Sequence, residues 1–172
     1  MDVLTPEQRS RNMSRVRGRN TKPELLLRRA LHATGLRHRL HVASLPGRPD
    51  LTYPRHRCVV QVHGCFWHGH DCPMFRLPAT RPTFWAAKIE ANRHRDRRTS
   101  AALQAAGWRV LTVWECALRG PARQPLGMVV AEARTFVLGD VAELELHGDW
   151  SQAPVAQGKR RSKRRQRDLC SR

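Results

Sequence analysis

The chain has 172 residues, 40% of them hydrophobic, which suffices for one domain with a hydrophobic core. Its 32 lysines and arginines outnumber 14 acidic residues, and the net charge of +18 indicates a polyanionic partner, nucleic acid before membrane. No apolar run approaches the ~20 residues of a membrane-spanning helix, and the N-terminus has no hydrophobic signal core. These features exclude an integral membrane protein and a secreted one, so we expect a soluble, cytoplasmic protein.

Three parts are predicted along the chain. Residues 1–20 form a polar, arginine-rich arm, either loosely held or lying along DNA. Residues 21–150 hold the folded domain, and residues 151–172 form a basic tail whose composition cannot bury a core.

A capped helix opens the folded domain. Thr21 is placed to cap its N-terminus, Glu24 follows at the spacing of a capping box, and Gly35 supplies the stop. Leu27 and Leu31 share the face of Glu24, so this face is expected to point inward. Glu24 then has two interpretations: it only caps the helix, or it also reaches a functional site.

Strands and helices alternate over the rest of the domain. Residues 48–53 and 57–63 read as two strands, and the second has so little polar alternation that we expect burial on both faces. A long helix follows over residues 83–106, a third strand over 109–114, and one helix or two short pieces over 123–147. This alternation predicts an α/β fold in which helices flank a mixed central sheet.

The stretch after the second strand concentrates groups that carry chemistry. An acid, Asp50, opens the first strand, and the second strand runs into a short loop. Ordinary loops do not gather metal ligands, acid–base groups and large rings so densely. Ten residues of this loop include His63, Cys65, Phe66, Trp67, His68, His70 and Cys72.

The cysteines point to a metal rather than to disulfides. Five cysteines are an odd count in a chain without a secretion signal. Cys65, Cys72 and the distant Cys116, with one histidine, suit a closed structural zinc site. Spacing does not decide between His68 and His70, and plain burial of the cysteines is the alternative. Cys58, inside a strand, is expected in the core.

One acid interrupts the apolar stripe of the long helix. Ile89, Asp96 and Leu103 are seven residues apart and therefore share a face. Asp96 either pairs with the arginines beside it or points inward and needs a buried partner. A carboxylate that orients a histidine is a common general-base arrangement, and the histidines of the loop are available partners.

Three aromatic residues near these groups have two interpretations. Phe66, Trp67 and Trp85 either pack in the core, or stack on bases and wedge between base steps.

At this level of detail the sequence is similar to one family. The segments SLPGRPD, HGCFWHGHDC, PATRPTFW, RDRR and GWRVLTVWECALRG resemble the very-short-patch repair (Vsr) endonucleases, over about Thr5 to Gly120. The resemblance implies a restriction-endonuclease-like fold with a structural zinc. It also implies magnesium-dependent nicking of DNA at T:G mismatches, which arise where 5-methylcytosine has deaminated.

The resemblance further implies roles for single residues. Asp50 and the main-chain carbonyl of Val62 would bind magnesium. His68 would activate water with Asp96 holding its ring, and His63 would lie near the scissile phosphate. Glu24 matches an acid near the metal. The implied zinc ligands are Cys65, His70, Cys72 and Cys116, and the implied DNA contacts are Met13, Phe66, Trp67, Trp85, Lys88 and Asn92.

The sequence also departs from what the fold and the family lead one to expect. Most nucleases of this fold carry an acid and a lysine where Gln61 and His63 stand, a substitution that the family shares. Gly69 and Asp71 occupy positions that are often histidine in the family. The basic tail has no counterpart that we can name.

These observations predict a monomeric, metal-dependent endonuclease that nicks double-stranded DNA 5′ of the thymine in a T:G mismatch. Mismatch-repair proteins are candidate partners, and no membrane partner is expected. Two alternatives fit the same composition: a non-catalytic DNA-binding protein held together by zinc, and a restriction-type nuclease that cuts paired duplex.

Overall fold

The computed structural model describes residues 18–151 together with residues 5, 7, 8 and 11. Met13, most of the predicted arm and the tail from residue 152 onward lie outside the described residues. The predictions made for them therefore stay predictions.

The centre of the fold is a five-stranded sheet with the order β1-β2-β3-β4-β5. β1 pairs with β2, and β2 with β3, in antiparallel orientation, whereas β3 pairs with β4, and β4 with β5, in parallel. The mixed sheet expected from the sequence is thus confirmed. The strands are β1 (Arg39–Leu40), β2 (Leu51–Tyr53), β3 (Cys58–His63), β4 (Arg109–Trp114) and β5 (Glu143–Leu146).

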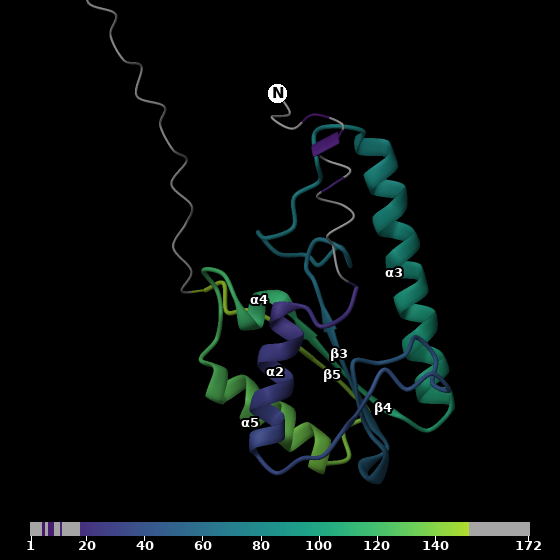
Figure 1. Cartoon of the computed structure of the whole chain (residues 1–172), viewed down its shortest axis with the longest axis vertical. Helices are drawn as coiled ribbons and strands as arrows, with labels where there is room; N and C mark the ends of the chain where they lie inside the picture. The colour runs from purple at the N-terminus through teal and green to yellow at the C-terminus, as the bar shows by residue number, and fades with distance from the viewer. Residues whose placement is uncertain (1–4, 6, 9–10, 12–17, 152–172) are drawn as a thin grey trace, which may run out of the picture.

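Helices cover both faces of this sheet (Figure 1). α2 and α5 pack on one face in the larger core cluster, and α3 packs on the other through Leu103. The N-terminal half of α3 extends beyond the sheet, alongside the loop that follows β3 (Figure 1). The helices are α2 (Lys22–Ala33), α3 (Pro82–Ala105), α4 (Glu115–Leu118) and α5 (Leu126–Leu138).

The central strand β3 is buried on both faces, as its apolar sequence predicts. Side chains alternate across a strand, so Cys58 and Val60 join the core under α2 and α5. Val59 faces the opposite way and packs with Val110 and Leu103. The same alternation places Gln61 and His63 on the α3 side, so the polar end of β3 faces that helix.

The start of α2 has the predicted capping box. The Thr21 hydroxyl accepts from the Glu24 main-chain N–H, and the Glu24 carboxylate accepts from the Thr21 N–H. Glu24 is nevertheless 2% exposed and lies on the same buried face as Leu27 and Leu31. Both interpretations of Glu24 therefore remain open at this level, because a cap does not require burial.

Four elements differ from the prediction. β1 and the short helix α4 were not foreseen, because they span only two and four residues. Residues 123–147 contain one helix, α5, followed by the strand β5, which the sequence analysis missed. β5 is only four residues long and lies at the sheet edge, where pairing with β4 rather than local pattern stabilises it. The first predicted strand begins only at Leu51, because Gly47 and Arg48 have positive φ angles of 70° and 50°.

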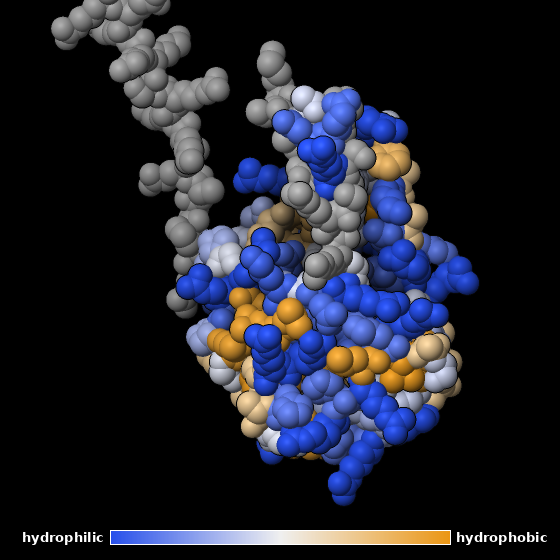
Figure 2. Space-filling view, viewed as in Figure 1, coloured by the Kyte–Doolittle hydropathy of each residue, from blue (hydrophilic) through white to orange (hydrophobic). Residues whose placement is uncertain are grey.

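The face seen in Figure 2 is mostly hydrophilic, with small hydrophobic patches. Within the described residues, no helix combines the length and apolar character needed to cross a membrane.

Candidate functional site

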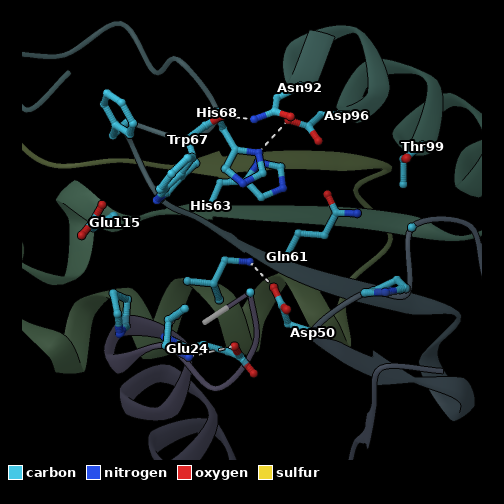
Figure 3. A pocket seen from close by; sticks show the side chains of 18 of the residues that line it. Glu24, Asp50, Gln61, His63, Trp67, His68, Asn92, Asp96, Thr99 and Glu115 are labelled. Carbon is cyan, nitrogen blue, oxygen red and sulfur yellow. Dashed lines mark hydrogen bonds and ion pairs between the residues drawn. The ribbon is translucent and has the colours of Figure 1, made fainter. Parts of the chain in front are cut away.

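A cleft of about 870 Å³ opens where the C-terminal end of β3 meets the start of α2, the start of β2 and the middle of α3. Acidic groups of α2 and β2 lie on one side of it and the histidines on the other, with Gln61 between them (Figure 3). Trp85 and Lys88 are not part of its lining. The predicted site residues that line it are Glu24, Asp50, Val62, His63, Phe66, Trp67, His68, Asn92 and Asp96.

Asp50 is held at the entrance to β2 by the neighbouring strand. The main-chain N–H of Val62 donates to Asp50 Oδ2 at 2.7 Å; Asp50 lies one residue, and Val62 two residues, beyond the last β2–β3 pair on this side. Burial, and then the negative charge of Glu24, raise the pKa of Asp50 to about 6, although the Val62 bond acts in the opposite direction. The site thus holds a carboxylate that is costly to ionise without a cation.

Glu24 lies beside Asp50 with one oxygen unsatisfied. Its Oε1 atom is buried and has no hydrogen-bond partner, and Arg28 Nη1 stands 3.8 Å away. Hard divalent cations bind carboxylate oxygens and main-chain carbonyls. A buried and a partly buried carboxylate, the first with an unsatisfied oxygen, therefore fit such an ion.

His68 and Asp96 form the pair expected from the sequence. The distance from His68 Nδ1 to Asp96 Oδ2 is 2.6 Å. Burial alone would raise the pKa of Asp96, but the hydrogen bond and charge of His68 lower it overall. An ionised carboxylate can only accept, so Nδ1 carries a proton, and in the neutral ring Nε2 is the acceptor. Arg95 also lies 3.6 Å from Asp96, so both predicted interpretations of this acid are realised.

His63 stacks on His68 and is partly buried. Their ring centroids are 3.9 Å apart and nearly parallel, at 6°. Burial, and then the charge of His68, lower the pKa of His63 to about 3. His63 is therefore neutral at physiological pH and offers one N–H and one acceptor nitrogen.

Three aromatic rings form a cluster at the end of the cleft. The ring centroid of Phe66 lies 5.1 Å from that of Trp67 and 5.4 Å from that of Trp85, and the centroids of the two tryptophan rings are 6.1 Å apart. All three are partly exposed rather than buried in the core. Asn92, only 7% exposed, donates to the Trp67 carbonyl at 2.8 Å, and so holds this loop against α3. Lys88 lies exposed on α3.

A second cluster lies behind the aromatic loop. Ligand atoms of Cys65, His70, Cys72 and Cys116 all fall within 4.8 Å of one another. His70 Nδ1 is 3.6 Å from Cys65 Sγ and 3.5 Å from Cys116 Sγ. Sulfur and nitrogen ligands at tetrahedral angles around zinc are about 3.6 Å apart. The cluster therefore fits zinc, and its histidine is His70 rather than His68.

The surroundings of this cluster favour a thiolate. A hydrogen bond from the Cys65 thiol lowers the pKa of Cys116 to about 5, and the Gly148 N–H also donates to Cys116 Sγ at 3.2 Å. The His70 ring stacks on the Trp114 ring with their centroids 4.2 Å apart, and this contact fixes the orientation of the imidazole. Cys58 lies apart from the cluster, fully buried, and burial raises the pKa of its thiol to about 12.

The sequence analysis missed one residue of the acidic side, His41. It follows β1 and comes close to both Glu24 and Asp50. His41 comes near Asp50 because it stands opposite that residue in the β1–β2 pairing. The sequence gives no sign of this pairing, since β1 has only two residues.

Comparison with known proteins gives the same assignment for most of the chain. The family described as DNA mismatch endonuclease Vsr matches residues 1–74. Type II nicking enzyme V.XorIIP of Xanthomonas oryzae is 54% identical over 136 residues, which cover 79% of this chain and 96% of that protein. The chain belongs to the Vsr family of DNA endonucleases.

Two further relatives extend over similar lengths. DNA mismatch endonuclease Vsr of Escherichia coli is 44% identical over 145 residues, covering 84% of this chain and 93% of that protein. Type II nicking enzyme V.NmeAIP of Neisseria meningitidis is 36% identical over 138 residues, covering 79% and 99%. Membership of the Vsr family makes this chain a DNA endonuclease, and DNA its substrate.

Loss of a cluster ligand tests the zinc site. Cys116→Ser is expected to leave the protein with well under one zinc per chain and to lower its free energy of unfolding by several kcal/mol, since structural zinc stabilises the folded state. Metal analysis and urea unfolding measure both. Cys58→Ala removes a buried thiol outside the cluster and should keep its zinc. A Cys116→Ser protein with full zinc content would contradict the assignment.

The pKa of Asp50 predicts an unusual effect on stability. The folded-state pKa of Asp50 lies above the ordinary value of 3.8. Ionisation of Asp50 therefore lowers the free energy of unfolding as the pH rises through about 6. Asp50→Asn should therefore stabilise the magnesium-free protein by about 1–2 kcal/mol at pH 7.5, and the gain should vanish near pH 4. Urea unfolding at several pH values measures this. The exposed Asp140→Asn serves as the control, and a destabilised Asp50→Asn at pH 7.5 would refute the prediction.

Proposed function

We propose that this protein is a magnesium-dependent endonuclease that nicks one DNA strand 5′ of the thymine in a T:G mismatch. The observation that carries the proposal is the convergence of Asp50 and the His68–Asp96 pair on one cleft, beside exposed aromatic rings. The relatives, which are described as a mismatch endonuclease and as nicking enzymes, support the same activity.

The hydrolytic step needs a base and a group that holds it in place. In the proposed mechanism, water attacks the phosphorus in line, and His68 Nε2 accepts its proton. Asp96, bonded to Nδ1, keeps the ring in the correct tautomer and stabilises the imidazolium that forms. The bond between phosphorus and the leaving 3′ oxygen breaks, and the product carries a 5′-phosphate.

The acidic side of the cleft holds the cation. Asp50 and the main-chain carbonyl of Val62 are the proposed magnesium ligands, with Glu24 beside them. When bound, magnesium supplies Lewis-acid stabilisation of the charge that develops on the phosphate. His63, neutral because of its lowered pKa, is suited to donate a hydrogen bond to a phosphate oxygen rather than to pair with it as a cation.

Selectivity for a mismatch is assigned to the rings. Inserting Phe66, Trp67 and Trp85 between base steps costs a few kcal/mol of unstacking for each step. A mispaired step is already weakly stacked, so the cost is lower there. Asn92 is also a proposed base contact, but in this structure its side-chain N–H donates to the Trp67 carbonyl. This bond helps to hold Trp67 in position. Lys88, exposed on α3, is the proposed base contact that stays accessible.

The remaining assignments complete this proposal. The endonuclease domain spans residues 21–150 and acts as a monomer. The arm over residues 1–20, with Met13 entering the duplex, and the tail over residues 151–172 provide further DNA contacts. Mismatch-repair proteins are the proposed protein partners.

One gel tests the activity against its alternatives. With magnesium, the wild-type protein should nick only the thymine strand of a T:G duplex and leave the matched T:A duplex intact. Asp50→Ala should keep its mobility-shift affinity for the mismatch and lose nicking by about 10³-fold or more, because the cation site is gone. The exposed Asp140→Ala is the matched control.

The other outcomes of this gel each exclude the proposal. Cutting of the matched duplex would indicate a restriction-type nuclease. Binding without cutting, with or without magnesium, would indicate a non-catalytic DNA-binding protein. Full activity of Asp50→Ala would overturn the assignment of the site.

Removing one ring tests the wedge. Trp67→Ala should weaken binding to the T:G duplex by about tenfold or more, since base stacking on a ring is worth about 1–3 kcal/mol. Binding to the matched duplex, which rests on phosphate contacts, should change little. Fluorescence anisotropy measures both, with the exposed apolar truncation Leu138→Ala as control. Equal losses on the two duplexes would argue against the wedge.

A further inference from the structure

An unassigned histidine lies at the acidic side of the cleft. His41 follows β1 directly, with a φ of 46°, and its main-chain N–H donates to the Pro49 carbonyl at 3.2 Å. The β1–β2 register pairs Leu40 with Leu51, and one residue further it brings His41 opposite Asp50. The imidazole is thereby directed at the carboxylates of the proposed cation site.

The distances around His41 match shared coordination better than hydrogen bonding. His41 Nε2 lies 3.6 Å from Glu24 Oε1, and Nδ1 lies 3.9 Å from Asp50 Oδ1. Both separations are too long for a hydrogen bond. Only one ring nitrogen of an imidazole can bind a given ion, so His41 Nε2 and Glu24 Oε1 are the pair to compare with coordination distances. Ligand atoms about 2.1 Å from one metal are about 3.0 Å apart when adjacent and about 4.2 Å apart when opposite. One ligand atom from each of the three residues lies within 4.8 Å of the others.

Two atoms of this cluster are buried and lack a hydrogen-bond partner. They are Glu24 Oε1 and His41 Nε2, the two atoms that face each other. Glu24 is 2% exposed, and its other oxygen accepts from the Thr21 N–H. Buried polar groups in native proteins are rarely left unpaired. A cation between these atoms satisfies the oxygen and the nitrogen together.

We infer that His41 is a third side-chain ligand of the cation site of Glu24 and Asp50, and that it favours first-row transition ions over magnesium. Magnesium is held through oxygen, whereas imidazole nitrogen suits transition ions. The inference rests on the proposed function, because Asp50 is common to both. It adds a determinant of which metal the endonuclease uses.

Metal binding by the zinc-loaded, full-length protein without DNA tests this inference. Mn²⁺ is the probe because it has the lowest affinity of the first-row ions and leaves zinc on its thiolates. In calorimetry, His41→Gln should weaken Mn²⁺ binding by about tenfold or more and change Mg²⁺ binding by less than about threefold. Pulsed electron paramagnetic resonance of the Mn²⁺-loaded wild type should show coupling to a directly bound ¹⁴N nucleus, which His41→Gln abolishes.

Controls separate the outcomes. His94→Gln removes an exposed histidine of α3 and should keep both the Mn²⁺ affinity and the ¹⁴N coupling. A wild-type protein without ¹⁴N coupling overturns the inference even if His41→Gln misfolds, and so does coupling that survives in a folded His41→Gln protein. Asp50→Asn distinguishes the two proposals. If it leaves metal binding and nicking intact, the proposed function fails; if it abolishes both while His41→Gln changes nothing, only the role of His41 fails.

Discussion

The hydrogen bond from the Val62 main chain to Asp50 is the contact on which the arrangement of the cleft depends. It ties the residue that precedes β2 to the far end of β3, the central strand of the sheet. Because β3 continues directly into His63 and the loop after it, the same bond sets the acidic side of the cleft against the histidine side. A shift of one residue in the β2–β3 register would turn the alternate side chains to the opposite face and disperse the site.

The two sides of the cleft have complementary electrostatics. On one side, burial and the proximity of Glu24 make the charge of Asp50 unfavourable, so the carboxylates gain from a cation. On the other side, His68 stabilises the charge of Asp96, while burial keeps His63 neutral. One side therefore carries carboxylates that gain from a cation, and the other carries histidines suited to accept or donate a proton. This separation supports a hydrolytic site more directly than a site for binding alone.

The loop after β3 serves both clusters. Cys65 and His70 anchor it at the zinc-type cluster, and Asn92 of α3 holds it again through the Trp67 carbonyl. Between these anchors the loop presents His68 toward Asp96 and the Phe66–Trp67 pair toward the open end of the cleft. A loop of this length without such anchors would pay a large entropic cost to hold two rings and a histidine in place. The cysteine cluster thus helps to hold the part of the loop that lines the cleft, although none of its four residues lines the cleft itself.

Local pattern determined much of this molecule. The capped helix α2, the doubly buried β3, the long α3 and the strand β4 follow from capping residues, apolar runs and helical periodicity, all of which act between near neighbours. That Asp96 pairs with a loop histidine was also foreseeable, because an acid on an apolar helical stripe needs a partner. That this histidine is His68 came only from the family resemblance.

Contacts between distant segments decided the rest. β5 is fixed by its pairing with β4, and its alternation of glutamate and leucine over four residues is a short signal that the sequence analysis did not use. The choice of His70 over His68 for the cysteine cluster depends on how the loop folds back toward Cys116, more than forty residues later. The approach of His41 to Glu24 and Asp50 depends on a strand of two residues. Periodicity and capping report on one segment at a time, whereas a site assembled from four segments is set by the sheet register and by packing between elements.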